Sequence, residues 1–221
     1  MFRQVLNVNY PLGRTYAKGI QVNIVVQEEI TPTVIFYKLG AQQICLSENE
    51  FQSLVNIESL LTSYFSRGST VDVGSRTQIS ATLSVRFDTS FEYRMLVLER
   101  LEEKGAAGPG LKTTSIWMIE KSWLSFLSLL PVIKHHLKNR QNWVNNVETL
   151  IYQMAKDTLK MYPEEMREGV TPIKYKRFLS SLDIKSYNEI ASEGLDITSL
   201  FYELSHFCAD HILYVARKNL N

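Results

Sequence analysis

The segment His206–His211, with the sequence HFCADH, gathers side chains that could ligate a metal ion. On a helix, His206 and Asp210 lie four residues apart on one face, whereas Cys208 and His211 lie on other faces. A closed zinc site needs four ligands that converge on one ion. We therefore expect these residues to take part in ordinary helix packing, and we expect no metal and no cofactor.

The glycine-rich segment EEKGAAGPGLK, residues 102–112, has a composition that phosphate-binding loops also use. It lacks the Gly-Lys-Ser/Thr ending of such loops and is not placed between a strand and the start of a helix. A β-hairpin turn explains it better. The sequence also contains no G-x-S-x-G, no H-E-x-x-H and no recognisable pair of catalytic carboxylates. We therefore expect a protein that is not an enzyme.

The charge of the chain is nearly balanced, with a formal net charge of +1. Residues 1–141 carry 15 Lys and Arg against 12 Asp and Glu, and residues 142–221 carry 9 against 11. This balance excludes a histone-like basic protein. Cys45 and Cys208 form no disulfide framework, in agreement with a reducing compartment, and no apolar run reaches the length of a membrane span. We expect an intracellular protein that contacts no membrane.

Two segments of the chain repeat the same apolar pattern: ICLSENEFQSLVNIESLLTSYF at 44–65 and IWMIEKSWLSFLSLLPVIKHHL at 116–137. Aligning them places Phe51 over Trp123. Alternating, strand-like segments precede both copies. The predicted strands are 4–10, 20–26, 33–39 and 42–47 before the first helix, and 69–75, 79–87, 91–101 and 113–119 before the second. The sequence thus predicts an α+β fold in which a four-stranded antiparallel sheet plus one helix occurs twice, at about 1–68 and 69–140.

The remaining segment, 141–221, has the periodicity of helices. We predict helices over 142–162, 173–182 and 196–220, with Asp196 as the N-cap of the last one. The domain prediction is therefore a repeat region at 1–140 followed by a helical C-terminal region at 141–221.

The segment ERLEEKGAAGPGLKTTSIWMIEKSWLSFLSLLPVI, residues 99–133, resembles the single-stranded-DNA-binding domain of the positive cofactor four family of transcriptional coactivators. The likeness lies in a charged, glycine-containing hairpin, a final strand, and a helix with Trp123 in its first turn. The first copy, with KLGAQQICL and Phe51, is a more diverged version. Whirly proteins resemble the chain in their duplicated strands-then-helix organisation, and the purine-rich-element-binding family does so more loosely. The C-terminal region has no counterpart in this resemblance.

The resemblance implies that open sheet faces bind single-stranded nucleic acid, DNA before RNA, in replication, transcription or genome packaging. On such a face aromatic rings stack on bases, each worth about 1–3 kcal/mol, while Lys and Arg follow the phosphates. The implied setting is the nucleus or other sites of nucleic-acid metabolism, with transcription or replication proteins as further partners and a homo-oligomer as the expected assembly. The candidate binding residues are Arg14, Lys18, Phe36, Lys38, Arg86, Tyr93, Arg94, Lys104, Lys112 and Trp117.

An alternative from another class is a protein–protein interaction or assembly module that keeps the fold without binding nucleic acid. The near-neutral charge favours it. The two hypotheses differ in the charge of the sheet face. Binding is favoured if Arg86, Arg94 and Lys38 cluster there without neutralisation by Asp88 and Glu92. Phe36 and Trp117 also have an ordinary interpretation as core residues.

Overall fold

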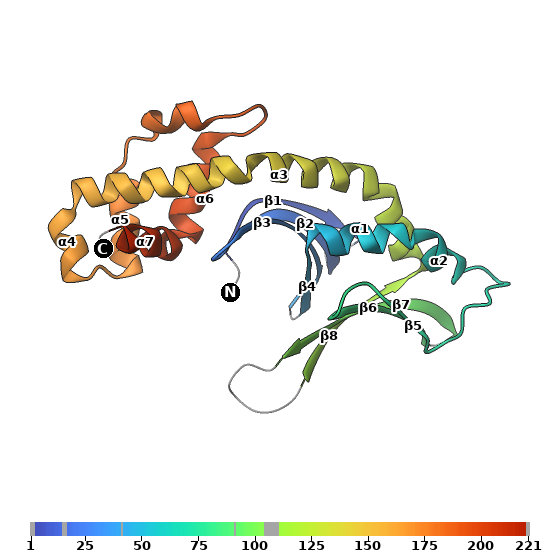
Figure 1. Cartoon of the computed structure of the whole chain (residues 1–221). Coiled ribbons are helices and arrows are strands. Elements are labelled where there is room, and N and C mark those ends of the chain that lie inside the picture. Colours follow the sequence, from blue (N-terminus) through green and yellow to red (C-terminus); the bar gives the residue numbers. More distant parts are fainter. Residues whose placement is uncertain (1–2, 15–16, 41, 91, 104–110, 220–221) are drawn as a thin grey trace. The chain divides into compact units, whose positions relative to one another are not determined.

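The computed structural model describes residues 3–14, 17–40, 42–90, 92–103 and 111–219 (Figure 1). It contains two four-stranded antiparallel sheets, with strand orders β1-β2-β3-β4 and β5-β6-β7-β8, and helices that follow each sheet. The predicted α+β class is therefore confirmed. Among the described helices, none combines the length and the apolar character needed to cross a membrane.

The first sheet follows the predicted order, and the single helix predicted after it is divided at Ile57 into α1 and α2. Alternation along β2 leaves Ile20, Val22, Ile24 and Val26 fully buried. The side chain of Ser47 caps α1: Ser47 Oγ accepts from Glu50 N at 3.3 Å, and Glu50 Oε2 accepts from Ser47 N at 3.1 Å. The elements are β1 (Arg3–Pro11), β2 (Lys18–Val26), β3 (Ile30–Lys38), β4 (Gln42–Leu46), α1 (Glu48–Asn56) and α2 (Glu58–Ser63).

The second sheet differs from the prediction at its first strand. The predicted strand at 69–75 is wrong, because Gly74 adopts a φ of +86° and Ser75 N closes a turn on Asp72 O at 3.3 Å. The strand begins only after this turn, at Arg76. The elements are β5 (Arg76–Gln78), β6 (Leu83–Ser90), β7 (Tyr93–Glu103), β8 (Leu111–Ile119) and α3 (Glu120–Met161).

The aligned helix positions of the two repeats meet in one core. Phe51 of α1 and Trp123 of α3 both pack on Phe126, with ring centroids 6.4 and 5.1 Å from that ring. Trp123 Nε1 also donates to Thr62 Oγ1 at 2.9 Å. Trp123 is therefore a packing residue, in keeping with its place in the repeat pattern. Strands β4 and β8 also lie next to each other.

The helix α3 is one continuous helix of 42 residues, where the sequence predicts two helices that meet near residue 140. Arg140, which lies where the sequence predicts the first of these helices to end, is buried. Its guanidinium donates to Leu6 O at 2.6 Å and lies over the ring of Trp143 at 5.3 Å. These contacts give the buried guanidinium a hydrogen-bond acceptor and a ring partner, so a charged residue is tolerated in the middle of a continuous helix.

The C-terminal helices pack into a second core. Asp196 caps α6 as predicted, since its carboxylate accepts from Thr198 N at 2.9 Å and Ser199 N at 3.2 Å. The predicted single helix over 196–220 is wrong: it is interrupted at Cys208, whose backbone leaves helical geometry at φ −118° and ψ 12°. The elements are α4 (Pro163–Glu168), α5 (Pro172–Ser180), η1 (Ile184–Ile190), α6 (Ile197–Phe207) and α7 (Ala209–Lys218).

The chain divides into two compact units that interleave in sequence. The C-terminal unit comprises residues 1–7, 23–32 and 137–221, and the repeat unit comprises 8–22 and 33–136. The domain prediction, with its boundary after residue 140, did not include the two N-terminal segments in the C-terminal unit. They belong there because Val5, Ile24 and Val26 share a hydrophobic core with the C-terminal helices.

Candidate nucleic-acid interface

The strand register divides the second sheet into a core face and an outer face. Leu83, Val85 and Phe87 lie on the core face and are buried. On the opposite side, Val97 pairs with Trp117 and Met95 pairs with Ile119, so these residues share the other face. We name this face the outer face. It carries Arg76 and Gln78 of β5, Ser84, Arg86 and Asp88 of β6, Tyr93, Met95, Val97 and Glu99 of β7, and Ser115, Trp117 and Ile119 of β8.

Two aromatic candidates are exposed on the outer face. Tyr93 is 70% exposed and Trp117 is 51% exposed, whereas Val97, which lies on β7 and pairs with Trp117, is buried. A large ring that folding leaves half in solvent on a sheet face can stack on a planar ligand. The register thus places both rings on the outer face, where they are exposed.

Two lysines of the first sheet lie near Trp117, at the β8 edge of the second sheet. Lys18, at the start of β2, donates from Nζ to Trp117 O at 3.0 Å. Burial lowers the pKa of the Lys18 ammonium, and repulsion from Lys38 lowers it further. Among the residues that the structure describes, neither lysine forms an ion pair with a carboxylate. An anion placed here would therefore relieve the repulsion between the two ammonium groups.

The β5 and β6 side of the outer face, across β7 from Trp117, is electrically neutralised. Arg86 donates from Nε to Glu99 Oε1 at 2.9 Å and from Nη1 to Asp88, while Arg76 Nη2 lies 3.2 Å from Glu99 Oε2. Two cations thus match two carboxylates. The ion pairs of Arg86 thus link residues of β6 and β7. Because carboxylates neutralise the cations here, this side of the sheet favours the assembly hypothesis.

Arg94 does not lie on the outer face. It pairs with Thr89, which places its side chain on the core face. There the guanidinium donates to the carbonyls of Tyr64 and Ser66, at 2.7 Å for Ser66, and lies 5.2 Å from the centroid of the Tyr64 ring. Tyr64 is the C-cap of α2, so Arg94 binds helix-end carbonyls. The expectation that Arg94 shares a face with Arg86 is wrong.

Phe36 also requires a correction. Its side chain is fully buried, and its ring packs 5.5 Å from that of Phe126. A ring enclosed in this way has no face left for a base. Lys38 is exposed on the same side of β3, because the strand leaves the core between the two residues.

The remaining candidates lie in connections. Arg14 is exposed in the segment that joins β1 to β2, which ends at Lys18. Lys112 belongs to β8, where the structure describes its backbone only, and Lys104 lies outside the described residues. Of the candidates, the structure therefore brings Lys18, Lys38 and Trp117 together.

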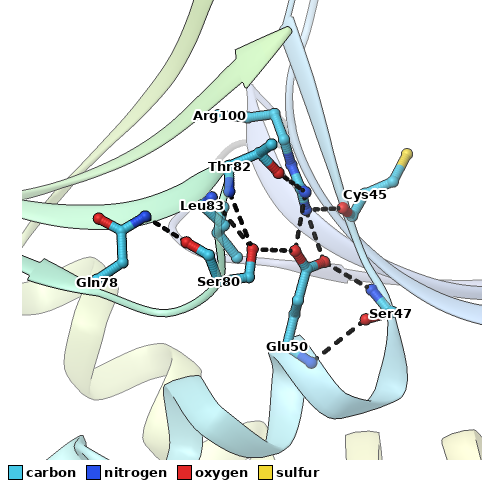
Figure 2. Close-up of polar contacts among 8 residues, drawn as sticks. All are labelled: Cys45, Ser47, Glu50, Gln78, Ser80, Thr82, Leu83 and Arg100. Carbon is cyan, nitrogen blue, oxygen red and sulfur yellow. Dashed lines mark hydrogen bonds and ion pairs between the residues drawn. The ribbon is translucent and has the colours of Figure 1, made fainter.

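A partly buried ion pair joins the two repeats (Figure 2). Arg100 of β7 donates to both carboxylate oxygens of Glu50, at 2.7 and 2.8 Å, and to Cys45 O at 2.5 Å. Ser80 Oγ adds a hydrogen bond to Glu50 Oε1 at 2.7 Å. Burial alone would raise the pKa of Glu50, but the hydrogen bonds from Arg100, Ser80 and Ser47 N together lower it. This network fixes the position of β7, which carries Tyr93 on its other side.

A hollow of about 520 Å³ lies at the end of the second sheet where Tyr93 is found. Sequence reasoning did not identify the further residues that line it, because they come from separate segments. The lining residues are Phe65, Ser66, Arg67, Glu92, Tyr93, Arg94, Ile119, Glu120 and Lys121.

The C-terminal unit offers a hollow of different character. It has a volume of about 680 Å³ and is lined by residues that include Glu28, Glu29 and His211. Its cation Arg3 is paired with Asp210 at 2.5 Å. The carboxylates of Glu28 and Glu29 repel phosphate, so this hollow does not suit a nucleic-acid strand. Within the described parts of the chain, no group of three or more His, Cys, Asp or Glu side chains is arranged to hold a metal.

Comparisons of the chain with protein-family models, with curated proteins and with solved structures found no match. The likeness to the positive cofactor four and Whirly families therefore has no support beyond the sequence pattern.

Proposed function

We propose that the protein binds single-stranded nucleic acid, DNA before RNA, on the outer face of the second sheet, without catalysing a reaction on it. The observation that carries the proposal is the group formed by Trp117, Lys18 and Lys38. Lys18 donates to the main-chain oxygen of Trp117, whose indole ring is half exposed, and Lys38 is near enough to Lys18 to repel its charge. Among the described residues, neither ammonium group forms an ion pair with a carboxylate.

The physical basis is the same as in other proteins that bind single strands. Stacking of one base on Trp117 contributes about 1–3 kcal/mol, and Tyr93 adds a second ring on the same face. Lys18 and Lys38 provide charge for the phosphates, and their mutual repulsion makes an anion favourable at this point. Bases inside a duplex are already stacked on one another, so the site favours unpaired strands.

Selectivity for sequence should be weak, because every base has a flat face and the described cations contact the backbone. We place the protein in replication, transcription or genome packaging inside the cell, in line with the resemblance to the positive cofactor four family. Transcription or replication proteins and a second copy of this chain are the protein partners that we propose.

The test is fluorescence anisotropy of a labelled single strand and of a duplex of equal length, titrated with the protein at low and moderate salt. We expect tighter and more salt-sensitive binding of the single strand. Trp117→Ala should weaken it, whereas Tyr152→Ala, which removes a 53% exposed ring in the C-terminal unit, should not. Absence of binding to either probe at micromolar protein would overturn the proposal.

The second candidate is an assembly module, favoured by the neutralised cluster of Arg76, Arg86, Asp88 and Glu99. Exposed rings on the C-terminal helices, at Tyr202, Phe207 and Tyr214, add apolar surface. Sedimentation analysis across a range of concentrations distinguishes the two. A stable oligomer that binds neither probe supports assembly, and a species that binds the single strand at every concentration supports nucleic-acid binding.

A further inference from the structure

The hollow at the end of the second sheet is formed by three separate segments. The connection after α2 contributes Phe65 to Arg67, the start of β7 contributes Glu92 to Arg94, and the junction of β8 with α3 contributes Ile119 to Lys121. Tyr93 and Ile119 belong to the outer face as well. The hollow is thus continuous with the surface that carries Trp117.

The charges around the hollow favour an anion. Arg67 and Lys121 are exposed and form no ion pair among the described residues, and Arg94 is bound to carbonyl oxygens, which leave its positive charge in place. Glu92 and Glu120 are the carboxylates in the lining. Three cations therefore face two carboxylates, in contrast to the balanced cluster around Arg86.

The apolar part of the lining suits a base. Tyr93 is 70% exposed and Ile119 is 43% exposed, and both flank the hollow. A flat ring can stack on the tyrosine while its edge rests on the isoleucine. Exposed aromatic and aliphatic side chains next to unpaired cations match the two parts of a nucleotide, the base and the phosphate.

The distance between the hollow and Trp117 allows one strand to use both. Trp117 and Ile119 are two residues apart on β8, which corresponds to about 7 Å along the strand. A nucleic-acid strand bound at Trp117 therefore reaches the hollow with a neighbouring nucleotide. Cations without an ion pair among the described residues are found at both sites: Lys18 and Lys38 near Trp117, and Arg67 and Lys121 at the hollow.

We propose that this hollow binds one nucleotide of the same single strand, with its base on Tyr93 and Ile119 and its phosphate held by Arg67 and Lys121. The inference rests on the proposed function, and it assigns to binding three residues that the sequence did not indicate: Ile119, Arg67 and Lys121. It also predicts a bound strand that runs along the end of β8 toward the start of α3.

The first experiment measures the salt dependence of binding of an oligothymidylate of about 16 nucleotides, a length at the upper end of single-site sizes. For a single strand, removal of one phosphate contact lowers the slope of log K against log salt by about 0.7. Arg67→Ser with Lys121→Ser should lower the slope by roughly this amount per residue. The matched control, Lys156→Gln with Lys185→Gln, removes the same charge from exposed positions in the C-terminal unit and should leave the slope unchanged.

The second experiment locates the base. An oligothymidylate that carries 5-iodouridine is irradiated in complex with the full chain, and the cross-linked peptide is sequenced. We expect cross-links at Tyr93 and at Trp117, and loss of the Tyr93 cross-link in Tyr93→Leu without loss of the one at Trp117.

The outcomes separate the two proposals. If the unmodified protein binds no single strand, the proposed function fails and this inference fails with it. If it binds, and Trp117→Ala weakens binding, an unchanged slope in the Arg67 and Lys121 variant overturns the inference alone. Absence of a cross-link at Tyr93 in a complex that cross-links at Trp117 also overturns it.

Discussion

Two groups of cations in the repeat unit differ in their partners: three arginines of the second sheet, and two lysines at the start of β2 and the end of β3 in the first sheet. Arg86 and Arg100 donate to carboxylates, and Arg94 donates to carbonyls at the end of a helix. Lys18 and Lys38, at the Trp117 end, have no carboxylate partner among the described residues. A positive side chain on a sheet therefore says little about binding until its internal partners are known.

The difference follows from the chemistry of the two side chains. A guanidinium donates several hydrogen bonds in a fixed plane, so it can hold a carboxylate and a carbonyl at once, as Arg100 does with Glu50 and Cys45 (Figure 2). An ammonium group is a compact charge on a flexible stem, which suits contact with a mobile phosphate. Arg86, Arg94 and Arg100 thus stabilise the fold, whereas Lys18 and Lys38 remain for a ligand.

The largest effect that would sharpen this comparison is on stability. Arg100→Ala leaves the carboxylate of Glu50 nearly buried with only Ser80 and Ser47 N as donors. We expect the free energy of unfolding to fall by about 3 kcal/mol, as for a broken buried ion pair. Urea denaturation measures it. Affinity for a single strand, measured where the variant is folded, should stay within a factor of about 2, a change smaller than the loss of one base stack.

A smaller loss of stability is expected when the neutralised β5 and β6 side of the outer face is altered. Arg86→Gln removes the partner of Asp88 and one of the two partners of Glu99, whose remaining contact is with Arg76. Because the pair is partly exposed, the loss of stability should be about 1 kcal/mol. Thermal unfolding checks this value. If the variant instead weakened binding as strongly as Trp117→Ala does, the assignment of Arg86 to the fold and not to binding would be wrong.

The lysine end should respond in the opposite way. Lys18→Gln with Lys38→Gln removes the repulsion between two like charges, so stability should be unchanged or slightly higher. The slope of log K against log salt should fall by about 0.7 for each phosphate contact that disappears. Salt titrations of the variant and of Lys156→Gln with Lys185→Gln, as the control, measure this. Equal slopes in the two variants would contradict the assignment.

Much of the fold could be predicted from the sequence because it depends on local patterns. The repeated order of strands and helix, Ser47 at the start of a helix and Trp123 as a packing residue all follow from alternation, capping and apolar spacing. The strand at 69–75 was mistaken because alternating Val71 and Val73 outweighed the glycine that follows them. Gly74 in a left-handed conformation interrupts the extended backbone there.

The site was less predictable because it depends on register and on distant partners. Arg86 and Arg94 are eight residues apart, and the pairing of Ser90 with Tyr93 decides that they lie on opposite faces. The short connection between β6 and β7 could have shown this, since a tight hairpin fixes which residues face each other. The ion pair of Arg86 with Glu99, and the convergence of Arg67 with Lys121, join residues whose proximity no local pattern indicates.

The remaining effects concern pH, and their direction differs between the two groups of cations. The folded pKa of Glu50 is lowered, so its ion pair contributes stability above the unfolded pKa of about 4.3. That contribution is lost as pH falls through the lower folded value. We expect the difference in unfolding free energy between the protein and Arg100→Ala to be constant from pH 7 to about 5 and to shrink below about 4. Urea titrations of both proteins at several pH values measure it.

The lysine end gives the opposite dependence. Because the pKa of Lys18 is lowered, its positive charge disappears at a lower pH than that of an ordinary lysine. Affinity for a single strand should therefore decline with rising alkaline pH before ordinary lysines titrate, and Lys18→Gln should remove that early decline. A decline that persists unchanged in Lys18→Gln would show that another group controls it, and the ammonium at Trp117 would then have no part in holding the strand.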